Sequence, residues 1–146
     1  QLAAGDYAKA RAAFSVVAKR TNSEMTAESK YSIAYIAFME GDYKESQRLS
    51  MEVQNQVPAY DYWIAKSFIL LGDNYLAQRD TFQARETYKS IVDNFDKGPD
   101  DPDDLSAIAR AKYDAIVEQE AARNKEGRKR AADAVPSDTL EISPIK

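Results

Sequence analysis

One short pattern occurs three times in this chain of 146 residues. Gly-Asp-Tyr begins at Gly5 and again at Gly41, 36 residues later, and the related triplet Arg79-Asp80-Thr81 follows after a further 38. A small residue stands four positions after each aspartate, at Ala10, Ser46 and Ala84. Repeats of this length are typical of stacked helical arrays, in which a unit buries its apolar face only against its neighbours. The pattern therefore predicts an all-α solenoid.

Helical periodicity continues along nearly the whole chain. It predicts about six helices, over residues 6–20, 24–39, 42–56, 60–78, 80–95 and 101–133. Short connections should join them into antiparallel hairpins. We expect Gly41 to end a helix in the left-handed conformation, and Asp42 and Asp80 to cap the helices that follow.

The acidic stretch 96–104 separates the repeats from the final helix. We expect Asp101 to cap this helix and Pro102 to occupy its first turn. The first half of the helix is amphipathic, through Leu105, Ile108, Ala109, Ile116 and Val117. The segment 123–130 carries five bases, one acid and no large apolar residue, so it should extend into solvent. We interpret its bases as a solvated helix end rather than as a contact for phospholipid or nucleic acid.

Composition argues against several kinds of chemistry. The chain has no cysteine and no histidine, which removes thiolate nucleophiles, imidazole bases and most transition-metal sites. No apolar run approaches the ~20 residues of a transmembrane helix, and a net charge of −4 does not favour nucleic acid. Tyr62 and Lys66 have the spacing of the pair in short-chain dehydrogenases, but the Gly-rich turn after a β-strand is absent. We predict a protein that is not an enzyme, with no cofactor and no metal site.

The chain resembles the tetratricopeptide repeat family over about residues 1–98. The best match is Leu71-Gly72-(x)2-Tyr75, continued by Ala84, Tyr88 and Phe95 in the order of the family. In that family the glycine and alanine let the paired helices approach closely, and the aromatic side chains fill the gaps; Ser46 stands where alanine is preferred. The resemblance divides the repeats into a partial unit over 1–26 and whole units over 27–60 and 61–98. We expect a capping helix over 99–134 and a disordered tail over 135–146.

In this family the first helix of each unit lines an inner concave surface. The resemblance places six side chains of this chain there: Tyr31, Tyr35, Met39, Lys66, Ile69 and Asp73. Tyrosine and methionine are favoured at binding surfaces, because they combine a large contact area with a polar group or a flexible thioether. Alternatively, these tyrosines and Met39 pack on the neighbouring unit. The lysines and asparagines of a carboxylate clamp do not stand at the matching positions, so an apolar or mixed peptide, or another helix, fits better.

The resulting prediction is a non-enzymatic scaffold that binds a partner peptide or domain on the concave face, within a larger complex. The alternative is a structural spacer that packs only against other repeats of its own chain. The phrase 65–73 is similar to cell-envelope members of the family from Gram-negative bacteria, which implies a periplasmic or envelope location. Gln1 falls within the first helix of a unit, so we expect Phe14 and Val17 to have an uncovered flank open to self-association.

Overall fold

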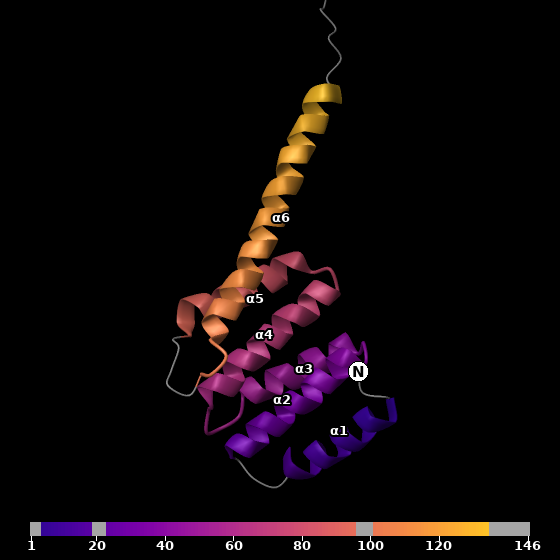
Figure 1. Cartoon of the computed structure of the whole chain (residues 1–146), viewed down its shortest axis with the longest axis vertical. Coiled ribbons are helices and arrows are strands. Elements are labelled where there is room, and N and C mark those ends of the chain that lie inside the picture. The colour runs from indigo at the N-terminus through magenta and orange to yellow at the C-terminus, as the bar shows by residue number, and fades with distance from the viewer. Residues whose placement is uncertain (1–3, 19–22, 96–100, 135–146) are drawn as a thin grey trace, which may run out of the picture.

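The computed structural model describes residues 4–18, 23–95 and 101–134, and these residues form helices and connecting turns without a strand. The six helices are α1 (Ala4–Ala18), α2 (Glu24–Met39), α3 (Tyr43–Gln54), α4 (Asp61–Ala77), α5 (Thr81–Asn94) and α6 (Leu105–Ala134). Each helix packs on the next one along the chain, as the ribbon in Figure 1 shows. The predicted stack of antiparallel helix pairs is therefore confirmed. The tail predicted over 135–146 lies outside the described residues.

The turns that follow α2 and α4 have the same backbone conformation although their sequences differ. Gly41 has a φ of 81° and Arg79 a φ of 64°, both in the left-handed region. In each turn the next residue is an aspartate whose carboxylate accepts from a backbone N–H three positions on, at 3.2 Å for Asp42 and 3.1 Å for Asp80. The predicted caps are confirmed, and the third copy keeps the turn without its glycine.

Small residues lie where the helices pack most closely. Four alanines are fully buried: Ala34, Ala37, Ala84 and Ala109. One buried cluster joins α4, α5 and α6, and a second joins α2, α3 and α4. Among the repeated aromatic residues Tyr88 is fully buried, whereas Tyr7, Phe14, Tyr43, Tyr75 and Phe95 are half-buried. Phe14 and Val17, expected at an uncovered flank, are both half-buried, and self-association through that flank stays a prediction.

Helix α6 begins at Leu105, so the prediction that Asp101 is its N-cap was wrong. The Asp101 carboxylate instead closes a turn before the helix, accepting from the backbone N–H of Asp103 at 3.2 Å and of Leu105 at 3.0 Å. Asp104 has a φ of 51°, and its carboxylate accepts from the N–H of Ala107 at 3.3 Å. Because this left-handed residue interrupts helical geometry, the helix starts after Asp104, and Asp104 caps it.

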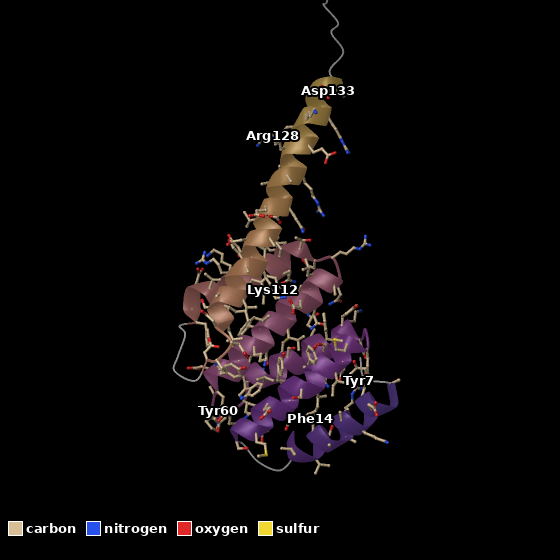
Figure 2. All side chains as sticks on the ribbon, viewed as in Figure 1. Tyr7, Phe14, Tyr60, Lys112, Arg128 and Asp133 are labelled. Carbon is tan, nitrogen blue, oxygen red and sulfur yellow. The ribbon has the colours of Figure 1, made fainter. Side chains whose placement is uncertain are left out.

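Only part of α6 packs against the other helices. Leu105, Ala109 and Ile116 are buried, whereas Ile108 and Val117 are exposed, which corrects the predicted apolar stripe. Every residue from 121 to 134 is exposed, and this part of α6, with Arg128 and Asp133, extends beyond the rest of the molecule (Figures 1 and 2). Its predicted extension into solvent is confirmed. Among the described helices, none has the length and apolar character needed to span a membrane.

Candidate functional site: a groove between α2, α4 and α6

A groove of about 240 Å³ lies between α2, α4 and the start of α6. Its lining consists of Tyr31, Tyr35, Lys66, Ile69, Leu70, Asp73, Asp103, Leu105 and Ile108. Tyr31 and Tyr35 are one helical turn apart on α2, and Lys66, Ile69 and Asp73 follow one stripe of α4. The structure therefore brings together five of the six predicted inner-face residues. The sixth, Met39, is exposed at the end of α2 and does not line the groove.

Lys66 is held among three aromatic rings on one wall of the groove. Its ammonium lies 5.2 Å from the ring centroid of Tyr31 and 5.4 Å from those of Tyr62 and Trp63. The Tyr31 ring comes from α2 and also contacts Trp63, with centroids 5.7 Å apart. Cation–π attraction and ring packing thus join α2 to α4 at this wall. Sequence reasoning missed Trp63, because nothing in its spacing shows that it meets Tyr31.

The Lys66 wall is tied to the turn before α6 through Asp103. The Tyr62 hydroxyl donates to Asp103, and the Lys66 ammonium lies 3.7 Å from the same carboxylate oxygen. Burial, together with the hydrogen bond to Asp103, raises the pKa of Tyr62 to about 12. The Tyr62 hydroxyl also lies 3.3 Å from the Lys66 ammonium, so the Tyr62–Lys66 contact is part of this wall.

Asp73 connects three helices at the other end of the groove. One of its carboxylate oxygens accepts from the Tyr88 hydroxyl of α5 at 2.5 Å and from the Lys112 ammonium of α6 at 2.8 Å. Figure 2 shows Lys112 where α6 crosses the other helices. Burial, and secondarily the Asp73 charge, raises the pKa of Tyr88. Asp73 was predicted as a surface residue, and the structure gives it a packing role as well.

The floor and the rim of the groove differ in character. Ile69, Leu70 and Leu105 are buried and form an apolar floor, whereas Tyr35 is 45% and Ile108 38% exposed at the rim. Burial also raises the pKa of Tyr31, with smaller contributions from the charges of Asp73 and Asp103. The lining carries two carboxylates and a single ammonium. Each of these carboxylates already has an ammonium partner, Lys112 for Asp73 and Lys66 for Asp103. The groove can therefore accept an apolar side chain on its floor, between paired charges.

Sequence reasoning missed the contribution of α6 to this site. Asp103, Leu105 and Ile108 lie about 35 residues beyond Lys66 and Ile69, and they reach the groove only because α6 packs beside α4 as α4 packs beside α2. The only available signal was the order of the repeats. If α6 is taken as the first helix of a further unit, its early residues fall on the inner face.

A larger hollow of about 350 Å³ lies along the α4–α5 hairpin, lined mainly by apolar side chains such as Ile64, Phe68 and Phe95. Its lining comes from a single hairpin, and Asp61 is its only charged residue. The α2–α4–α6 groove joins three helices and carries three charged side chains. We therefore regard the groove as the candidate site.

Among the described residues, no three carboxylate, thiol or imidazole side chains gather closely enough to hold a metal ion. The described residues form an all-helical, repeat-like fold with a groove lined by alternate helices. No protein-family model, curated protein or solved structure matches the chain.

Proposed function

We propose that this chain is a non-enzymatic interaction module of the tetratricopeptide-repeat type, which binds a segment of a partner protein in the α2–α4–α6 groove. The observation that carries this proposal is the exposed pair Tyr35 and Ile108, which face one groove from helices more than 60 residues apart in sequence. A rim of a tyrosine and an aliphatic side chain above an apolar floor is the composition that protein interfaces favour. The envelope location rests on the resemblance of residues 65–73 alone.

A second candidate is the structural spacer, and one observation favours it. Tyr31 is packed against Trp63 of the next helix pair, and Asp73 is held by Tyr88 and Lys112. Tyr31 and Asp73 thus stabilise the stack itself. Tyr35 and Ile108 distinguish the two candidates, because a spacer does not require exposed apolar side chains at the rim of the groove.

The test selects peptides from a random displayed library on the wild-type protein and measures their dissociation constants by calorimetry. The groove variant is Tyr35→Ala with Ile108→Ala. Loss of two interface anchors should raise the dissociation constant at least about tenfold, which corresponds to about 1.4 kcal/mol. Met39→Ala, tested separately, shows whether the binding surface reaches the end of α2.

The matched control replaces an aromatic and an aliphatic side chain of similar exposure outside the groove. Phe82 on α5 is 64% exposed and Val117 on α6 is 39% exposed. Phe82→Ala with Val117→Ala should leave the dissociation constant within about twofold, a change of under half a kcal/mol. Peptides that bind the groove variant as well as the wild type would argue for the spacer.

A further inference from the structure

We propose that one face of α1 is a docking surface for an amphipathic helix from outside these 146 residues, which runs antiparallel to α1 and has a glycine where it crosses Phe14. The residues of this surface, here called the α1 face, are Ala10, Ala13, Phe14 and Val17. The α1 face is separate from the α2–α4–α6 groove, because no residue of α1 lines the groove.

Helix α1 is packed on one side only. Among the described helices it packs against α2, whereas α3 lies between α2 and α4, and α5 lies between α4 and α6. Figure 1 shows α1 at the end of the stack. In an array of this kind each unit is stabilised by its interfaces with its neighbours. Helix α1 therefore presents to solvent the side on which α3 meets α2 and α5 meets α4.

The repeat spacing identifies the side chains that lose cover. The intervals of 36 and 38 residues place Ala10, Phe14 and Val17 in register with three side chains of α3 and three of α5. The six are Ser46, Ser50, Val53, Ala84, Tyr88 and Ile91, and none is more than 3% exposed. Their counterparts in α1 are all half-buried, and Ala13 is exposed where Leu49 of α3 is buried. The hydrophobic effect would favour a helix that covers these apolar side chains.

The later hairpins show what kind of helix fits an aromatic ring at this position. The ring of Tyr88 leaves no room for a β-carbon on Gly72 of the covering helix α4. In the preceding hairpin the residues in register are Ala34 and Ser50, so a small side chain on the second helix accompanies alanine on the first. All four positions are buried. Phe14 has a ring like that of Tyr88, so the helix that covers it needs a glycine at the crossing.

A second copy of this chain does not offer such a helix. The described helices contain three glycines, Gly5 in α1, Gly72 in α4 and Gly127 in α6. The glycine of α4 is buried in its own helix pair, and that of α6 lies within 121–134, which has no large apolar side chain. An antiparallel pair of α1 helices with Gly5 opposite Phe14 would bring Asp6 against Ala13, and burying an unpaired carboxylate is costly. A partner helix outside this sequence is therefore the occupant.

The test places a covering helix on α1 through the Gly5-Asp6 turn motif. Residues 60–78, which include all of α4, are inserted before Gly5 in place of residues 1–4. The inserted glycine then stands 16 positions before Phe14, as Gly72 stands before Tyr88. Docking of the inserted helix on the α1 face should raise the melting temperature by at least about 5 °C over that of the wild type.

Two substitutions in the extended chain test the pairing of glycine with Phe14. Alanine in place of the inserted glycine should remove at least about half of the rise, because its β-carbon meets the Phe14 ring. With Phe14→Ser also present, the same alanine should have little effect, since alanine and serine stand in register in the α2–α3 hairpin. A double-mutant cycle measures this coupling. Phe14→Ser in the chain without the insert is the control, because it reports only the packing of Phe14 on α2.

Three results would overturn the proposal. The first is an insert that leaves the melting temperature unchanged, and the second is an alanine substitution that has the same effect with Phe14 as with Phe14→Ser. The third is a wild type that dimerises at about 0.1 mM in sedimentation equilibrium and becomes monomeric with Phe14→Ser, because the α1 face would then belong to a second copy. Peptide binding that depends on Tyr35 and Ile108 would survive each result, so failure here is distinguishable from failure of the proposed function.

Discussion

Gly72 of α4 lies against the ring of Tyr88 of α5, which leaves no room for a side chain at position 72. A β-carbon placed on Gly72 would lie 2.4 Å from Cε1 of Tyr88 and 2.8 Å from its Cδ1 and Cζ. The ring cannot move aside easily, because Tyr88 is fully buried and its hydroxyl donates to Asp73. This is the close approach of paired helices that the repeat resemblance implies for Gly72 and Tyr88. The glycine is needed for space rather than for backbone freedom.

Gly72→Ala is therefore expected to lower the free energy of unfolding by about 1–3 kcal/mol, the usual effect of overpacking. This should happen although alanine is the better helix former by about 1 kcal/mol. Urea denaturation followed by circular dichroism measures the change. Gly127→Ala is the control, since a β-carbon there meets nothing within 4 Å, and it should stabilise its helix. A Gly72→Ala protein as stable as the wild type would contradict the packing argument.

In the two equivalent turns, introducing a glycine and removing one should change the free energy of unfolding in opposite directions. Arg79 has a φ of 64°, so Arg79→Gly should raise the free energy of unfolding by up to about 1 kcal/mol by relieving left-handed strain. Gly41 has a φ of 81°, so Gly41→Ala should lower the free energy of unfolding by about 1 kcal/mol. Melting temperatures of the two variants measure both effects. Shifts in the same direction would show that something other than backbone conformation governs these turns.

A buried pair explains why Ser46 replaces the alanine that the repeat pattern favours. The Asn74 side-chain amide donates to Ser46 Oγ at 2.8 Å and to the Leu70 carbonyl at 2.9 Å, and both side chains are fully buried. Ser46→Ala removes one acceptor and should cost about 1–3 kcal/mol of unfolding free energy. Ser46→Ala with Asn74→Leu, which removes both partners, should cost less than Asn74→Leu alone. Additive losses in this double-mutant cycle would mean that the pair is not coupled.

Stability should be nearly constant from about pH 6 to pH 9 and fall above about pH 10, because histidine and cysteine are absent and tyrosine titrates near pH 10 when unfolded. Burial raises the pKa of Tyr31 and Tyr88, and that of Tyr62 to about 12. The folded state then keeps protons that the unfolded chain loses, so the stabilisation is complete below pH 10 and lost as the pH rises. The raised pKa of Tyr88 alone should lower the free energy of unfolding at pH 11 by about 1.4 kcal/mol relative to neutral pH.

Urea denaturation at several values between pH 8 and pH 11.5 measures this loss. Tyr88→Phe cannot ionise, so it should be less stable than the wild type at pH 8 but lose less stability on the way to pH 11. An equally steep loss in this variant would place the alkaline transition on other groups.

The helices were predictable because their signals are local. Apolar spacing, Gly41 and the two capping aspartates depend on neighbours three or four positions away, and each kept its expected role. The start of α6 was misplaced for the same reason. Asp101 and Pro102 match a local capping pattern, but the Asp101 carboxylate bonds to Leu105 N–H and closes a turn before the helix. The local sequence is compatible with a helix that starts after Asp101 or after Asp104. In the observed structure it starts after Asp104, and Leu105 packs into the core.

By itself, the sequence determined the class of fold, the boundaries of most helices and the face of α2 and α4 that carries Tyr35 and Asp73. Periodicity within one helix is enough for the fold class and the boundaries, whereas the inner face was what the resemblance to the repeat family implied. Only the tertiary structure decided which of these side chains are packed and which are open. Trp63 covers Tyr31, Lys112 binds Asp73, and α6 adds Ile108 to the groove. These contacts join residues about 30 to 40 positions or more apart, and the angle between helices that brings them together is set by buried packing rather than by any local pattern.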